Sequence, residues 1–179
     1  MGRAAYPHPE MPGVYILPLT KGFHALVDEI DAAAASEFNW FTITKRNYGG
    51  RHLPRENGKC GPILYLHRFI GNRMGLIGDQ VDHRSRDNVR DCRRDNLRGA
   101  TIKENTRNGS LRSTNTSGYK GVIWEKRQQK WVARITVDDK QIHLGTFEDP
   151  KIASDAYDQA AEKYFGEFAA PNSALARSA

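Results

Sequence analysis

The sequence predicts an α+β fold built from two small modules. Short β-prone runs and short helical segments alternate as far as residue 108, and from residue 117 the pattern becomes three β-prone runs followed by one long helical segment. A chain of 179 residues is long enough for one medium domain or two small ones. We expect a loose N-terminal arm at 1–12, a first domain at 13–108, a polar linker at 109–116, a second domain at 117–172 and a tail at 173–179.

The first elements follow from alternation and turn residues. Three prolines in residues 1–12 predict the loose arm. Val14–Leu17 and Phe23–Val27 alternate as strands do, with a turn at residues 20–22 between them. Residues 28–38 are rich in alanine and acidic at the start, which suits a short helix.

The next stretch is expected to complete a small sheet. Residues 40–44 are β-prone, and the aromatic side chains of Trp40 and Phe41 in such a run favour a core position over DNA stacking. Residues 48–50 and 56–59 have the composition of turns or loops. Residues 63–66 predict another strand, or the start of a helix that continues through His67.

A set of polar residues after this sheet is suited to phosphodiester hydrolysis. Asp82 and His83 end a short strand, Asn96 precedes a second strand, and Asn105 lies in a short helix. Asp82 and Asn105 offer oxygen ligands to a hard divalent cation, which fills its open positions with water. A ring nitrogen of His83 can take a proton from such a water. A base and a metal ion with open coordination sites are what this reaction needs.

From about Val14 to Asn108 the chain resembles the HNH nuclease family, in particular the phage and intron-borne endonucleases. The resemblance implies a ββα-metal module, a β-hairpin and helix around one Mg²⁺ or Mn²⁺ ion. It implies that His83 is the general base, that Asp82 and Asn105 bind the metal, and that Asn96 holds the hairpin loop. It also gives Arg68 a structural or phosphate-contacting role. The segments that carry this resemblance are Leu66–Ile70, Val81–His83, Asn96–Arg98 and Glu104–Asn105.

Two departures from the HNH pattern leave an alternative open. The loop between His83 and Asn96 is one residue longer than usual, and Cys92 stands where many members carry asparagine. An Asp–His pair by itself is common at protein surfaces. An inactive copy of the site is therefore the alternative to a working nuclease.

The charge of the chain favours a polyanionic partner. It carries 27 Lys and Arg against 21 Asp and Glu, a formal net charge of +6, although excess charge also serves solubility. A phosphate backbone would explain the arginines near the predicted site, and we expect Arg94 and Arg98 to contact it. These arginines are Arg84, Arg86, Arg90, Arg93, Arg94 and Arg98.

Several protein classes are disfavoured. Cys60 and Cys92 form no Cys-x-x-Cys pair, so a cysteine-based structural zinc is not expected, and free thiols suit a reducing cytoplasm. The N-terminus has no apolar core of a signal peptide, and no segment reaches the roughly 20 apolar residues that span a bilayer. We expect a cytoplasmic protein, acting in the host cytoplasm if phage-encoded, with no membrane partner and no obligatory protein partner.

The second module has clear strand, turn and helix signals. Asp138 and Asp139 suit a two-residue hairpin turn. Asp149 is placed to cap a helix that starts with Pro150, and alanines at helical spacing give that helix a small-residue core face. The predicted strands lie in Tyr119–Trp124, Lys130–Val137 and Lys140–Phe147.

Four segments of this module form a recognisable pattern: Tyr119–Val122, Leu144–Phe147, Ala156–Ala161 and Ala170–Asn172. Through these segments the module, about residues 116–172, resembles the AP2 DNA-binding domain, in which three antiparallel strands enter the major groove and one helix backs them. Ile123, Arg134 and His143 replace residues of the plant pattern, so the plant base preference does not transfer. The resemblance implies DNA-facing positions for Lys120, Gly121, Ile123, Arg134, Thr136, Gln141 and His143, with Arg127 and Lys130 adding positive charge toward phosphates.

Together these observations predict a metal-dependent, homing-type DNA endonuclease that cuts or nicks duplex DNA. The alternative is a sequence-specific DNA-binding regulator that keeps an inactive HNH scaffold. An RNA-directed nuclease is less favoured, because the deep groove of A-form RNA excludes a β-ribbon that a DNA major groove admits.

Overall fold

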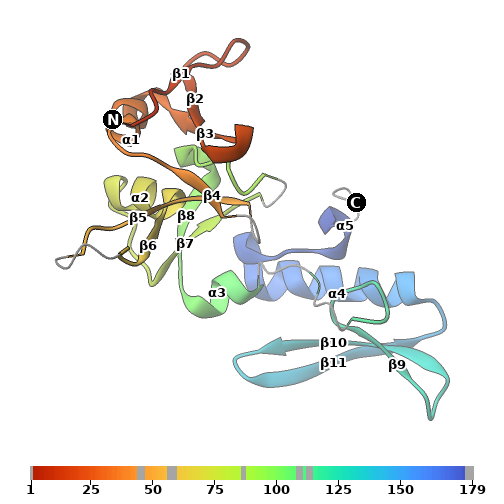
Figure 1. The fold of residues 1–179 in the computed structure, drawn as a ribbon. Coiled ribbons are helices and arrows are strands. Elements are labelled where there is room, and N and C mark those ends of the chain that lie inside the picture. The colour runs from red at the N-terminus through yellow and green to blue at the C-terminus, as the bar shows by residue number, and fades with distance from the viewer. Residues whose placement is uncertain are drawn as a thin grey trace. The chain divides into compact units, whose positions relative to one another are not determined.

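The chain forms two compact units, residues 1–101 and 102–179, each with antiparallel sheets and helices (Figure 1). The computed structural model describes residues 2–43, 47–55, 60–85, 88–107, 111 and 115–175. The predicted mixed fold with a three-stranded antiparallel sheet in the second unit is confirmed. Across the described ranges, no helix combines the length and apolar character needed to cross a bilayer.

The first sheet has the order β1–β2–β3. Its strands are β1 Tyr6–Pro7, β2 Val14–Pro18 and β3 His24–Asp28, and the turn between β2 and β3 holds the 3₁₀ segment η1 Thr20–Gly22. The predicted loose arm is wrong, because Tyr6 pairs with Ile16 and the backbone N–H of Ala5 donates to Ser36 Oγ at 2.9 Å. The prolines that exclude a helix are tolerated in a short edge strand.

The second sheet has the order β4–β5–β6, with strands β4 Phe41–Ile43, β5 Tyr48–His52 and β6 Ile63–Tyr65. The predicted turn at 48–50 is wrong. Gly49 and Gly50 pair with β4, and Gly50 also pairs with β6, so pairing on both sides overrides the local turn signal. The predicted loop at 56–59 lies outside the described residues. Residues 63–66 satisfy both alternatives, since β6 passes directly into helix α2 Leu66–Arg73.

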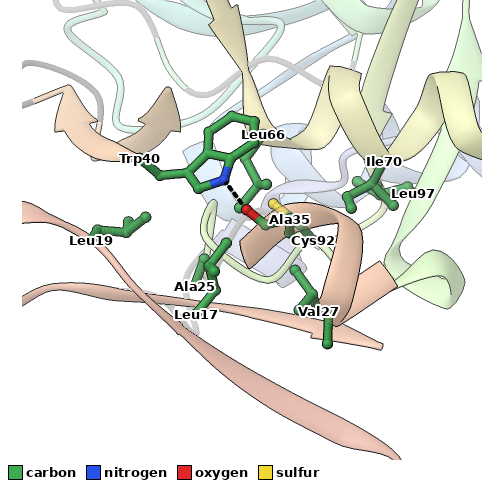
Figure 2. Close-up of a cluster of buried hydrophobic side chains, with 11 residues drawn as sticks. Leu17, Leu19, Ala25, Val27, Ala35, Trp40, Leu66, Ile70, Cys92 and Leu97 are labelled. Atoms are coloured by element: carbon green, nitrogen blue, oxygen red, sulfur yellow. Dashed lines mark hydrogen bonds between the residues drawn. The ribbon is translucent and has the colours of Figure 1, made fainter. Parts of the chain in front are cut away.

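The core of the first unit gathers apolar side chains from β2 and β3 of the first sheet, from α2 and from helix α1 Glu29–Ser36 (Figure 2). Trp40 is 1% exposed, and its indole Nε1–H donates to the carbonyl of Ala35 at 2.8 Å. The predicted core position of Trp40 is therefore confirmed. Its polar ring atom is satisfied by the last turn of α1, which fixes the ring between that helix and the sheets.

A third, two-stranded sheet completes the first unit. It pairs β7 Gln80–His83 with β8 Leu97–Ala100, and the 3₁₀ segment η2 Arg94–Asn96 leads directly into β8. Leu97 belongs to the core cluster, so β8 is anchored by burial. The single small sheet predicted for this region is thus three separate sheets around one core.

A buried carboxylate joins three elements of the first unit. Asp31 on α1 has no exposed surface, and it accepts from Arg73 Nε of α2 at 2.7 Å and from Arg94 Nε of η2 at 2.7 Å. Burial alone would raise the pKa of Asp31, but hydrogen bonds and charge from Arg94 and Arg73 outweigh it and hold the pKa below its ordinary value.

The second unit is a three-stranded antiparallel sheet backed by a helix. The sheet has the order β11–β10–β9, and helix α4 packs along it (Figure 1). Asp138 and Asp139 both have positive φ, the conformation of the predicted two-residue turn. Asp149 accepts from the backbone N–H of Lys151 and caps α4 as predicted. The elements are β9 Val122–Glu125, β10 Lys130–Val137, β11 Lys140–Phe147, α4 Pro150–Phe165, η3 Gly166–Phe168 and α5 Asn172–Leu175.

The boundary between the units lies earlier than the predicted linker at 109–116. Helix α3 Ile102–Arg107 belongs to the second unit. Lys103 pairs with Asp139 and Arg107 with Asp138, and the guanidinium of Arg107 lies over the Phe165 ring. Charges at the hairpin turn thus hold a helix that the sequence assigned to the first domain.

We expect Asp31→Asn to lower the free energy of unfolding of the first unit by about 3 kcal/mol at pH 7, because two arginines lose their shared carboxylate. The lowered pKa of Asp31 means that its contribution is present above the unfolded pKa near 4 and is lost as pH falls through the folded value. The difference between wild type and variant should therefore shrink on acidification below pH 4.

Urea denaturation of the full chain at pH 7 and pH 3, with hydrogen exchange assigning the transition to the first unit, measures this difference. Asp79→Asn, which removes an exposed acid of the same unit, is the matched control. Equal stability of wild type and Asp31→Asn at pH 7 would contradict the assignment.

Candidate functional site

The β7–β8 hairpin places Asp82 and His83 next to each other, each 3% exposed. Adjacent side chains in a strand point to opposite faces, so the two groups have different surroundings. Asp82 lies opposite Arg98 on β8, and its Oδ2 accepts from Arg98 Nη2 at 2.9 Å and from Nε at 3.2 Å. The carboxylate that the sequence assigns to a metal ion is therefore bound by a buried guanidinium.

His83 lies in an aromatic cluster. The ring centroids of His83 and His67 are 4.9 Å apart, and Tyr48 lies 5.8 Å from His83 and 5.2 Å from His67. Burial lowers the pKa of His67 to about 3, with the nearby His83 and Arg68 adding to the effect. His67 is thus neutral at physiological pH, and it lies on α2, which carries the segment Leu66–Ile70 that resembles the HNH family.

Cys92 contacts the predicted base directly. Its Sγ lies 4.0 Å from His83 Nε2, and its side chain is buried in the hydrophobic core. Burial raises the pKa of the Cys92 thiol, and the charge of Asp91 adds to this, so the sulfur stays protonated. The departure from the HNH pattern therefore places a neutral thiol, rather than an amide, against the imidazole.

Asn96 spans the loop between the two strands. Its Nδ2 donates to the carbonyl of Asp91 at 2.9 Å, and its Oδ1 accepts from the backbone N–H of Ser85 at 2.9 Å. The structure places Asn96 where the resemblance assigns a loop-holding residue. A buried amide with both ends used fixes the start and end of the loop.

The arginines around this hairpin are largely engaged within the first unit. Arg94 binds Asp31, Arg93 binds Asp91 at 2.7 Å, and Arg98 is 5% exposed and binds Asp82. Both Arg94 and Arg98 bind carboxylates of their own unit, and their contact with a phosphate backbone stays a prediction. Arg90 lies over the Phe23 ring, and Arg86 lies outside the described residues. Arg68 is exposed on α2, and its DNA contact stays a prediction.

Metal binding stays a prediction as well. Asn105, the second expected ligand, lies on α3 and so belongs to the second unit. In the described part of the chain, no three His, Cys, Asp or Glu side chains gather as a metal-binding group. Asp82 is a suitable oxygen donor for Mg²⁺ or Mn²⁺, but a cation would share its carboxylate with Arg98.

In the second unit, the sheet has one face on α4 and one open face. Trp131, Ala133 and Ile135 of β10 pack in the clusters with α4, so the alternating side chains point the other way. We call this side the open face. Its members Lys130, Arg134, Thr136, Gln141 and His143 are residues predicted to bind DNA.

The open face carries a hollow and an ordered polar pair. The hollow has a volume of about 330 Å³. Arg134 Nη1 donates to Gln141 Oε1 at 3.0 Å across the two strands. Polar side chains held in a concavity can fix the orientation of a bound group. The hollow is lined by Glu125, Gln128, Val132, Arg134, Gln141, His143 and Thr146.

Three further predicted positions lie outside the strands of this face. Lys120 precedes β9, and its Nζ donates to the carbonyl of Ala170 at 3.3 Å. Gly121 has φ 69°, and a Cβ there would overlap the ring of Tyr157 on α4, so close packing requires glycine at this position. Arg127 is exposed in the turn between β9 and β10, and its contact with phosphates stays a prediction.

A buried network, which the sequence did not predict, ties the C-terminal segment to this sheet. The carboxylate of Asp158 on α4 accepts from the backbone N–H groups of Asn172 and Ser173 at 2.7 and 2.9 Å. The Asn172 side chain in turn accepts from the backbone N–H of Lys120 and donates to its carbonyl. The sequence signal that could have predicted this network is Asp158, an acidic residue on the alanine-rich face of α4.

Two comparisons with known proteins bear on these sites. Residues 117–167 match the AP2 domain, which implies DNA binding by this part of the chain. The chain is also 39% identical over 64 residues to Protein 3.8 of Escherichia phage T7. That match covers 36% of this chain and 52% of the phage protein, so the chain spans about half the length of that relative.

Gly121→Ala should destabilise the second unit by about 2 kcal/mol or more, because the added methyl group meets both the Tyr157 ring and an unfavourable φ. Gly118→Ala is the matched control, since Gly118 has φ 78° with open space around the added atom and incurs only the backbone strain. Thermal unfolding of the full chain compares the two variants. A smaller loss of stability in Gly121→Ala than in Gly118→Ala would contradict the close-packing role.

Proposed function

We propose that the chain binds duplex DNA with the open face of β9–β10–β11 laid into the major groove. The observation that carries this is the gathering of Lys130, Arg134, Gln141 and His143 on the side of the sheet that α4 leaves uncovered. A small antiparallel ribbon fits the width of that groove. The match of residues 117–167 to the AP2 domain supports the proposal.

The cations of this face divide into two groups. Lys130 and Arg127 are exposed at the end of the sheet where β9 turns into β10, a position suited to phosphates at the groove edge. Arg134 and Gln141 lie inside the hollow, where base edges are the natural partners. Arg127 and Lys130 would therefore position the protein on the duplex, and Arg134 and Gln141 would select the base sequence.

Arg127→Ala and Lys130→Ala should each weaken binding to all duplexes alike and flatten the plot of log Kd against log salt by about one unit. Titrations of the full chain with a fixed duplex at four salt concentrations measure this slope. Lys151→Ala, which removes an exposed cation on α4, should leave the slope unchanged. Unchanged slopes in both test variants would place the phosphate contacts elsewhere.

We propose as a second function that the first unit hydrolyses DNA phosphodiester bonds. The supporting observation is the juxtaposition of Asp82 and His83 on β7, with Asn96 fixing the loop that follows. His83 would accept the proton of the attacking water at a ring nitrogen. A Mg²⁺ or Mn²⁺ ion bound through Asp82 would supply positive charge to the phosphate and the leaving 3′-oxygen, and Asn105 is the further ligand that the sequence suggests.

Two observations favour the alternative, a DNA-binding regulator with an inactive HNH-like unit. His83 is 3% exposed, although a general base must reach a water. The carboxylate of Asp82 is held by Arg98, although a metal ligand must be available to the ion. A working nuclease would need these two groups to open when DNA binds.

The nuclease proposal predicts that His83→Ala lowers the rate of plasmid cleavage by on the order of 10²–10⁴ while duplex affinity is unchanged. Supercoiled plasmid is incubated with full-length protein in Mg²⁺, in Mn²⁺ or in a chelator, and the products are separated on a gel. His24→Ala, an exposed histidine of β3, is the control. If wild type cuts under none of these conditions yet binds duplex DNA, the regulator is correct.

A further inference from the structure

The β10–β11 ladder is irregular at the centre of the open face. The register shifts between Ala133 and Arg134, so that Ala133 lies opposite Gly145 while Arg134 lies opposite His143. Leu144 is the extra residue, and it packs in the core with α4. The bulge therefore keeps an apolar residue inside while His143 and Arg134 stay on the same open face.

Glycine is required for this bulge. Gly145 has φ 149°, and a Cβ there would lie 2.7 Å from the ring of Phe147. The backbone can approach that ring only without a side chain. The arrangement of Arg134, Gln141 and His143 is thus fixed by the backbone of the sheet.

The hydrogen bond between Arg134 and Gln141 determines what the pair can offer to a ligand. Gln141 Oε1 already accepts from Arg134 Nη1. An arginine has donors and no acceptor, and the remaining polar atom of the glutamine side chain is the donating amide nitrogen. The bond to Gln141 holds the guanidinium across the two strands and leaves its other N–H groups to donate to a ligand.

The guanidinium of Arg134 can only donate, and this favours some bases over others. Guanine presents two acceptors in the major groove, O6 and N7, which match the fork of an arginine. Adenine presents N7 beside the N6 amino donor, and a guanidinium has no acceptor for that amino group. Cytosine presents its N4 amino donor there.

We infer that Arg134 recognises guanine in the major groove, and that Gln141 supports this preference by setting the direction of the guanidinium through their hydrogen bond. This inference rests on the proposed binding of duplex DNA by the open face. Arg134 is the base-contacting residue, and Gln141 is a positioning residue that acts through it.

The surroundings of Arg134 distinguish this role from a phosphate contact. Glu125 lines the same hollow, and its carboxylate would repel a phosphate placed there. A base edge carries no net charge and meets a much weaker repulsion. The other cations of this surface, Arg127 and Lys130, lie in and beside the turn between β9 and β10.

The inference is tested with the full chain on a duplex selected from a random library by the wild-type protein. Each guanine of the selected site is replaced in turn by 7-deazaguanine, which lacks N7, or by inosine, which keeps O6 and N7 and loses only the minor-groove amino group. We expect one guanine at which 7-deazaguanine weakens wild-type binding about tenfold while inosine has little effect.

Three variants then identify the residues responsible. Arg134→Lys keeps the charge but loses the fork, so it should lose the sensitivity to 7-deazaguanine at that position while keeping non-specific affinity. Gln141→Ala should reduce the preference for guanine over adenine there. Lys151→Ala should behave as wild type.

The outcomes distinguish a failure of the proposed DNA binding from a failure of guanine recognition by Arg134. A wild-type chain that binds no duplex overturns the proposed function. A chain that binds duplex DNA but shows no guanine with this sensitivity, or in which Arg134→Lys retains it in full, overturns the guanine inference and leaves DNA binding intact.

Discussion

The first unit depends on one buried carboxylate. Asp31 is the common acceptor for arginines of α2 and η2, and the backbone N–H of Arg94 also donates to Asp28 Oδ2 at 2.6 Å. These bonds fix the entry of the chain into β8, and β8 is the strand whose pairing places Asp82 and His83. The candidate chemistry of the first unit is therefore supported from a helix about 50 residues earlier in the chain.

Net charge is a poor guide to where such a chain meets a polyanion. The arginines that cluster most densely in the sequence, near the predicted nuclease site, include three whose guanidinium groups bind carboxylates of the first unit. The cations on the second sheet are sparser but more exposed. A guanidinium that is hydrogen-bonded to a carboxylate has fewer donors left for a phosphate. The exposed cations, although fewer, are therefore better placed to attract a polyanion.

The words that resemble an AP2 domain are explained mostly by architecture. Gly121 lets the chain pass against Tyr157, and Gly145 permits the bulge beside Phe147. Asn172 links the loop before β9 to Asp158 on the helix. Two side chains of the open face, Arg134 and His143, stand where this chain differs from the plant pattern. The resemblance thus predicts the fold of the module. The proposed contacts to bases depend on the side chains of Arg134 and Gln141 themselves.

Local pattern in the sequence was sufficient for most of the elements. Alternation predicted β2, β3, β10 and β11, and the Asp149–Pro150 pair predicted the start of α4, because caps and strand periodicity are short-range properties. The Asp-His pair and the loop-spanning Asn96 were also visible in the sequence.

Long-range contacts decided the rest. They turned a glycine-rich stretch into the strand β5, drew α3 to the hairpin turn of the second unit, and paired Asp82 with Arg98. They also occupied the arginines that sequence proximity assigned to phosphate. Each of these contacts is stabilised by residues that are distant in the chain. The local sequence does not identify the partner of a buried charge or of a strand edge.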